Sequence, residues 1–266
     1  MYNEKLNKWG LPQEFKGLFI KPLRLLDEKK YETMQKILCY PKHIVQDRIV
    51  SKASYLNFII NVLYAFDLQE NEKSTMISDL TDFLGFVTDM KCDILFEYRK
   101  QSVETMLDMK YTLLFYEIEG GEHVNEIKIT ENDFENIRKI VLEQNGITVK
   151  SVEEYIPALE EKLQIANKKD NMTFEEELFS LCDACGLTIN EISNYTIYQF
   201  KKHFQRTQLR VEFLAFKPLE VSGQIKLKNG EIKHWLSHIS DKGRYDSILI
   251  SKETYQKEND IFKVSQ

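Results

Sequence analysis

The order of apolar and polar residues in the first third of the chain predicts an arm, an extended segment and then helices. Residues 1–14 are expected to form an irregular arm, and residues 15–24 an extended segment that Pro22 confines to a sheet edge or a strand end. Asp27 is the expected N-cap of the first helix, which must stop before Pro41. The helices predicted by hydrophobic periodicity in this part cover residues 27–39, 54–66 and 76–87, the second being apolar almost all round and therefore buried.

The middle of the chain has the clearest strand pattern. Residues 111–119 and 123–129 are extended runs on either side of Gly120 and Gly121, which predicts a β-hairpin. The pattern around residues 88–110 does not separate helix from strand, and residues 246–262 are equally open.

A helix is expected directly after the hairpin, over residues 133–144. Thr130 or Asn132 is its candidate N-cap, and Asn145 with Gly146 closes it. Its apolar positions recur at helical spacing and predict a buried face made of Phe134, Ile137, Ile140 and Val141.

The C-terminal half shows two capping boxes, at residues 173–176 and 188–191, in which a threonine and a glutamate satisfy each other's backbone amides. The first helix is expected to end at Gly186. A longer helix of about 20 residues is predicted from Thr196 onward, with its end at Pro218. Its predicted buried face consists of Ile197, Phe200, Phe204, Val211 and Leu214.

These elements predict an α+β fold that is predominantly helical, with an N-terminal strand and a central β-hairpin. Three parts are expected along the chain: an α+β N-terminal domain at residues 1–150, a helical region at residues 151–220, and a polar, turn-rich tail at residues 221–266. The second part begins with a more polar helix or linker over residues 151–171.

Charge and composition narrow the functional classes. The 266 residues include 36 Lys and Arg against 42 Asp and Glu, a net charge of −6, whereas non-specific nucleic-acid binders need a basic face. No run approaches the roughly 18 apolar residues of a membrane span, and the first residues lack a signal-peptide pattern. With 4 cysteines and no secretion signal, the chain is expected to be a soluble intracellular protein with reduced thiols.

Two residue pairs are candidates for chemistry. Cys182 and Cys185 form a CxxC pair, but at a helix C-terminus, where the dipole opposes a thiolate, so core packing is the favoured interpretation over a redox or metal role. His234 and His238 are four apart, as in a zinc-binding helix, with Glu231 one turn upstream. Position 235 holds a tryptophan where a general base would be needed, so a surface or interface cluster is favoured.

A basic patch follows the last long helix: Lys201, Lys202, His203, Arg206 and Arg210. Such a patch attracts an acidic protein segment or nucleic acid. Because the whole chain is acidic, a solvated outer face is the favoured interpretation.

Several segments together resemble tail-morphogenesis proteins of bacteriophages of Gram-positive hosts, a group related to tail assembly chaperones. The resemblance spans roughly residues 15–238. The segments that carry it are residues 19–31, the helix entered at residues 54–56, then residues 132–145, 172–178, 195–200, 223–225 and 232–236.

The resemblance implies a non-enzymatic phage tail assembly or virion structural protein, without catalytic residues, cofactors or metals. Its implied partners are the tape-measure protein or baseplate components, a homo-oligomer is compatible, and neither a membrane nor nucleic acid is expected. The implied location is the host bacterial cytoplasm or the virion tail. The 13 Tyr and 16 Phe suit interface anchors, and the candidate partner-binding residues are Phe200, Phe204, His234, Trp235, Arg244 and Tyr245.

Two alternatives of other classes stay open. One is a metal-dependent or regulatory enzyme that uses His234 and His238. The other is a host-takeover regulator that binds nucleic acid through Lys201, Lys202 and Arg206.

Overall fold

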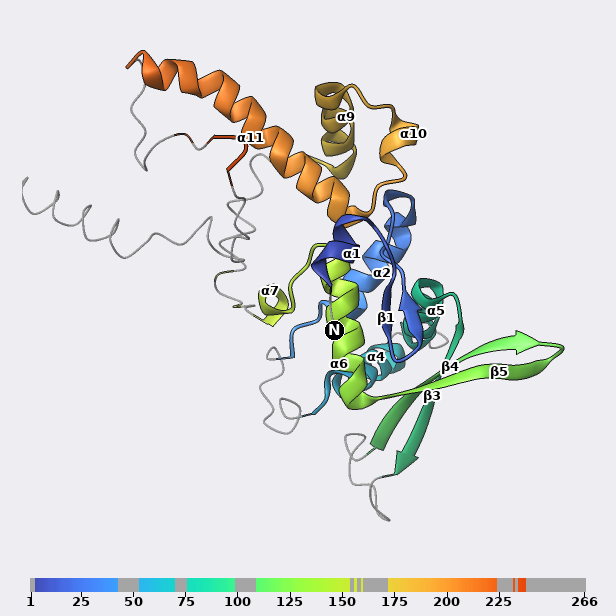
Figure 1. Cartoon of the computed structure of the whole chain (residues 1–266). Helices are drawn as coiled ribbons and strands as arrows, with labels where there is room; N and C mark the ends of the chain where they lie inside the picture. Colours follow the sequence, from blue (N-terminus) through green and yellow to red (C-terminus); the bar gives the residue numbers. More distant parts are fainter. Residues whose placement is uncertain are drawn as a thin grey trace, which may run out of the picture.

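The computed structural model describes residues 3–42, 53–69, 76–98, 109–153, 156, 159, 172–223, 232 and 234–237. The predicted fold class is confirmed: the chain is α+β and mostly helical, with a two-stranded and a three-stranded antiparallel sheet (Figure 1). Two elements project from the packed helices, the hairpin of the larger sheet on one side and the long C-terminal helix on the other (Figure 1).

The N-terminal arm is ordered, so the prediction of an irregular segment is wrong. Helix α1 (Glu4–Lys8) begins at Asn3, whose side chain accepts a hydrogen bond from the Lys5 amide at 3.0 Å. The side-chain amide of the buried Asn7 donates to the Glu143 carbonyl at 3.2 Å. A helix this short has little stability of its own, so this contact with a residue 136 positions away decides its structure.

In place of the single extended segment predicted over residues 15–24, the structure has a small hairpin of β1 (Gln13–Phe15) and β2 (Leu18–Ile20), which begins within the predicted arm. Both Lys16 and Gly17 at its turn have positive φ. Pro22 follows the strand, where the missing amide costs no ladder hydrogen bond.

Three helices follow close to their predicted bounds. The turn η1 (Leu25–Asp27) leads into α2 (Glu28–Leu38), and Asp27 is its N-cap residue, although its carboxylate accepts from the Arg24 amide. Helix α5 (Met76–Thr88) packs on both α2 and α4 (Tyr55–Gln69), and the Tyr55 hydroxyl on α4 donates to the Ile37 carbonyl of α2 at 3.0 Å. The described start of α4 is buried at consecutive positions from Tyr55 to Ile60, as its apolar composition predicts.

The larger sheet has the order β3-β4-β5, with strands β3 (Lys91–Tyr98), β4 (Met109–Glu119) and β5 (Glu122–Thr130). The predicted β4–β5 hairpin is confirmed, and its turn places Gly120 and Gly121 at φ +62° and +91°, which glycine adopts without strain. Strand β3 lies within residues 88–110, where the sequence pattern did not separate helix from strand. Pairing with β4 along its whole length decides its conformation.

Helix α6 (Glu131–Gln144) starts two residues earlier than predicted because Thr130, and not Asn132, is the cap. The Thr130 hydroxyl accepts from the Asp133 amide in a capping box. All four apolar positions predicted for its buried face are at most 1% exposed. Short helix α7 (Val149–Glu153) follows.

The last described helices are α9 (Phe174–Cys185), α10 (Ile189–Ile192) and α11 (Ile197–Val221). Both predicted capping boxes are present, and α9 ends at Gly186 with φ +65°. The expected stop at Pro218 is wrong, because α11 has 25 residues and continues past it. Proline removes one hydrogen-bond donor here, but Pro218 lies in the last turn and its own carbonyl still accepts from the Ser222 amide.

Candidate partner-binding surface

The first two turns of α11 are anchored in the body of the molecule. Thr196 caps the helix in a capping box with Gln199 and is itself buried. Ile197 and Phe200 are 4% and 1% exposed, and the Phe200 ring meets that of Phe174 on α9 edge-on, with centroids 5.3 Å apart. The start of α11 is tied to the N-terminal part by the Ile197 amide, which donates to the Leu23 carbonyl at 3.1 Å.

Lys201 is a second anchor of this helix. Its ammonium donates to the Tyr31 hydroxyl on α2 at 2.6 Å, and burial lowers the pKa of this lysine. Burial also raises the pKa of Tyr31 to about 12. The interpretation of the basic patch as a solvated outer face is therefore wrong for Lys201, which is turned into the protein.

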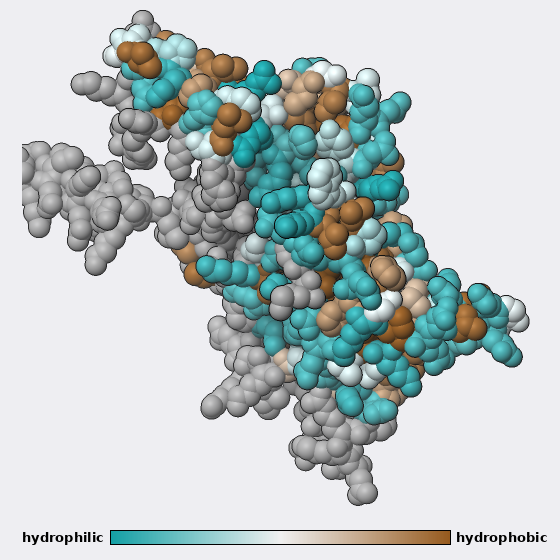
Figure 2. Space-filling view, in the orientation of Figure 1, coloured by the Kyte–Doolittle hydropathy of each residue, from teal (hydrophilic) through white to brown (hydrophobic). Residues whose placement is uncertain are grey.

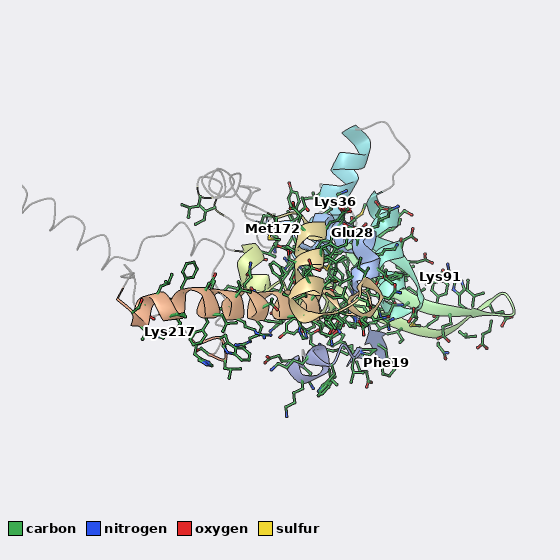
Figure 3. The ribbon with its side chains drawn as sticks, turned by 90° about the horizontal axis from the view of Figure 1, so that it is seen from above. Phe19, Glu28, Lys36, Lys91, Met172 and Lys217 are labelled. Atoms are coloured by element: carbon green, nitrogen blue, oxygen red, sulfur yellow. The ribbon has the colours of Figure 1, made fainter. Side chains whose placement is uncertain are left out.

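The outer half of α11 is exposed on the face that the sequence predicted to be buried. Val211 and Leu214 are 56% and 59% exposed, and Val221 near the end is 77% exposed. Figure 2 shows hydrophobic side chains on this projecting end. Seen from above in Figure 3, α11 runs away from the dense side-chain packing, with Lys217 near its outer end. The prediction of burial is wrong here because α11 extends beyond the elements that pack against its first turns, which form the root of the helix.

Helix α9 packs against the first part of α11, and this packing ends in the middle of α11. Its last residue, Cys185, places its sulfur 3.6 Å from the Thr207 hydroxyl, in the middle of α11. Cys182 is buried and Cys185 is exposed, so core packing holds for only the first of the pair. Desolvation, followed by the nearby Asp183, raises the pKa of Cys182, which disfavours a thiolate.

A short returning segment, residues 234–237, lies against another face of α11. The Arg206 guanidinium donates to the carbonyls of Trp235 and Ser237, the latter at 2.8 Å. The His234 ring meets the Phe213 ring edge-on at 4.7 Å, and its Nδ1 accepts from the Leu236 amide at 3.1 Å. These residues form a turn, and His238, the second histidine of the candidate pair, lies outside the described residues.

The candidate partner-binding residues therefore fall into two groups. Phe200 and Phe204 stack at 6.2 Å at the root of α11, where Phe200 is part of the core. His234 and Trp235 lie on the returning segment. Arg244 and Tyr245, like His238, lie outside the described residues. Val211 and Leu214 were predicted from the sequence to share one face of this helix, but that face was expected to be buried, and Val221 lies past the predicted end of the helix.

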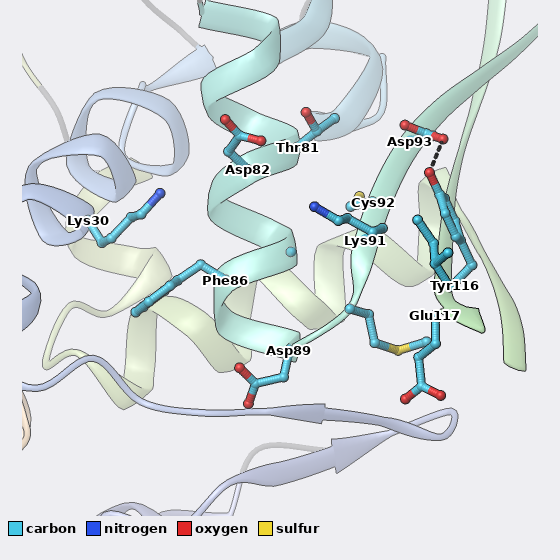
Figure 4. A pocket seen from close by; sticks show the side chains of 13 residues that line it. Lys30, Thr81, Asp82, Phe86, Asp89, Lys91, Cys92, Asp93, Tyr116 and Glu117 are labelled. Atoms are coloured by element: carbon cyan, nitrogen blue, oxygen red, sulfur yellow. Dashed lines mark hydrogen bonds between the residues drawn. The ribbon is translucent and has the colours of Figure 1, made fainter. Parts of the chain in front are cut away.

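A separate hollow of about 730 Å³ lies between the C-terminal half of α5 and strands β3 and β4 (Figure 4). Its charged lining mixes signs: Lys30 and Lys91 face it together with Asp82, Asp89, Asp93 and Glu117. The Tyr116 hydroxyl donates to Asp93 at 2.8 Å, and Lys21 pairs with Asp89.

The cysteine in the wall of this hollow is not an activated nucleophile. Cys92 in its wall is buried, and that burial raises the pKa of its thiol. Nowhere in the described residues do three or more His, Cys, Asp or Glu side chains gather as a metal site would require. Among the described helices, none has the length and apolarity needed to cross a membrane.

Comparison with known proteins connects the α9–α11 unit to phages. No curated protein matches the chain, and no solved structure matches it. Residues 166–240 match the family model described as "YomV second domain". That range contains α9, α10, α11 and the returning segment. The family is phage-derived, of the Bacillus prophage type, so this match over the C-terminal unit supports a phage protein.

Proposed function

We propose that this chain is a non-enzymatic phage protein that acts through protein–protein contacts, either in tail assembly or as a structural component of the tail or baseplate. The observation that carries the proposal is the outer half of α11. It presents apolar side chains to solvent within the part of the chain that matches the phage-derived family.

Exposed apolar residues on a rigid helix suit a binding role. Scattered exposed apolar residues are common, but those that share one face of a helix mark interaction sites. The root of α11 is fixed by Phe200 and Lys201, so the outer half is presented in one orientation and loses little conformational entropy on binding.

The proposed partners are tail proteins such as the tape-measure protein or baseplate components. A long, largely helical partner supplies amphipathic helices during assembly, and an apolar helix face is the complementary surface. The acidic net charge of −6 keeps such a protein soluble while that surface is open.

The test is mass spectrometry on purified phage particles and on the soluble fraction of the same infected lysate. A tagged wild-type chain is compared with Leu214→Asp, and Phe216→Asp serves as the matched control because Phe216 is also exposed, at 48%, on a different face of α11. The chain is expected in particles or in a soluble complex with a tail protein. Leu214→Asp should reduce that association and Phe216→Asp should preserve it. The proposal would be overturned if the chain were found neither in particles nor in a soluble complex with a tail protein.

A further inference from the structure

The exposed face of α11 continues a helix–helix interface that already exists inside the molecule. Its positions follow each other at alternating steps of three and four residues, the spacing of a coiled-coil seam. They are Ile197, Phe200, Phe204, Thr207, Val211, Leu214, Pro218 and Val221, which we call the α11 seam.

The inner part of the seam is covered by α9. Phe174 meets Phe200 near the start of α9, and Cys185 meets Thr207 at its end. Past Thr207 the same seam is open, with Val211 56%, Leu214 59% and Val221 77% exposed. The open part from Val211 to Val221 is about 15 Å long, which is the length of about three helical turns. A helix from a partner would continue the packing that α9 begins.

The charged residues that border the open part of the seam are all cations. On one border lie His203, Arg210 and Lys217, and on the other Gln208, Ala215 and Ser222. Neither border contains a carboxylate. Helical geometry places Glu212 and Glu220 away from the seam. Lys217 pairs with Glu220 at 2.7 Å, and Arg210 is exposed.

A second copy of this chain is a poor occupant of the seam. In an antiparallel pair, the border with Arg210 and Lys217 would face its own copy, and like charges would repel. In a parallel pair, the same two residues would face Ala215 and Ser222, which offer no counter-charge. A helix with carboxylates beside its apolar face satisfies both the seam and its basic border.

We propose that the open part of the α11 seam binds an amphipathic helix of a partner protein whose apolar stripe is bordered by Asp or Glu. This rests on the proposed function and adds the chemical class of the partner. Val211, Leu214 and Val221 supply the apolar contact, and Arg210 selects the acidic border, next to Lys217 in its pair with Glu220.

The test uses the full chain and two synthetic helical peptides of about 18 residues. Both peptides carry the same leucine stripe. One has glutamate at the bordering positions, and its twin has lysine. Fluorescence anisotropy at low salt is expected to show the glutamate peptide binding about tenfold or more tightly than the twin. That preference should shrink as salt is added.

Two variants and a control locate the binding. Leu214→Asp should weaken the glutamate peptide about tenfold or more, because it places a charge in the apolar seam. Arg210→Glu should weaken it by about fivefold and improve binding of the lysine twin. Phe216→Asp should change neither affinity by more than about twofold, since its side chain points away from the seam. Far-UV circular dichroism should give the wild-type helical spectrum for all three variants.

Three outcomes would overturn the inference: equal affinity for the two peptides, no binding of either, or a dimer in light scattering that only Leu214→Asp dissociates. The last would assign the seam to a second copy. The inference and the proposed function fail separately. A chain that is found with tail proteins in infected cells but binds neither peptide keeps the function and loses the acidic helix as its partner.

Discussion

The two halves of α11 have the same apolar pattern and opposite environments. At the root, Ile197 and Phe200 are 4% and 1% exposed. In the outer half, Val211 and Leu214 occupy the same face and are 56% and 59% exposed. Helical periodicity states which residues share a face, but burial requires a second element on that face. Here α9 covers the root only, so one face of one helix is core at one end and surface at the other.

The largest expected effect tests the root. Phe200→Ala should lower the free energy of unfolding by about 3–5 kcal/mol, because it opens a cavity between α9 and α11. Urea unfolding followed by circular dichroism measures the change. The matched control is Phe216→Ala in the outer half, which should cost roughly 0.5 kcal/mol or less. Similar costs for the two variants would contradict the division of α11 into a buried root and an exposed outer half.

The second prediction concerns the Tyr31–Lys201 contact at the root. Burial raises the pKa of Tyr31 to about 12, above its ordinary value of 10.0. The folded state therefore holds the phenol proton more tightly than the unfolded state. That contribution to stability is fully present below pH 10 and is lost as the pH rises towards 12.

Between pH 9 and 12, the free energy of unfolding of the wild type should consequently fall by roughly 2 kcal/mol more than that of Tyr31→Phe. Lys201 contributes with the opposite sign and at lower pH, because burial lowers its pKa from 10.5. Urea unfolding of the wild type and the variant at several alkaline pH values gives the difference. Parallel pH profiles would show that Tyr31 does not retain its proton in the folded protein.

The third prediction separates a buried cap from an exposed one. Thr196→Ala removes the cap of α11 and should cost about 1 kcal/mol or more. Thr196 is 4% exposed, so its partners lose a hydrogen bond that water cannot easily replace. Thr173→Ala, in the exposed capping box of α9, should cost less. Thermal and urea unfolding measure both losses of stability. A loss for Thr173→Ala as large as that for Thr196→Ala, or larger, would show that tertiary burial of the cap is unimportant.

The smallest effect belongs to the outer half. Leu214→Ala should change the free energy of unfolding by no more than about 0.5 kcal/mol, because its side chain is already in water in the isolated chain. The same variant should still weaken binding of the glutamate-bordered peptide, since a bound helix would bury that side chain. A large loss of stability of Leu214→Ala in the absence of the peptide would mean that the outer half of α11 is buried in the folded chain.

Much of the local structure was determined by the sequence itself. Capping boxes at Thr173 and Thr188, the left-handed cap at Gly186 and the turn at Gly120 and Gly121 depend on neighbouring residues, whose chemistry is visible in the sequence. The helix predicted over residues 133–144, and found at residues 131–144, depends on the same kind of local signal, as does its buried face. The match to a phage-derived family is also a property of the sequence.

Only the tertiary structure decided which of these elements are packed against others and which of their faces are buried. Helix α1 forms because Asn7 bonds to Glu143, β3 because β4 pairs with it, and Lys201 turns inward because Tyr31 lies opposite. Each partner is more than 10 positions away in the chain, and no local pattern encodes such a distance. The exposed α11 seam has the same origin: its spacing was set by the sequence, but its exposure follows from α9 ending beside Thr207.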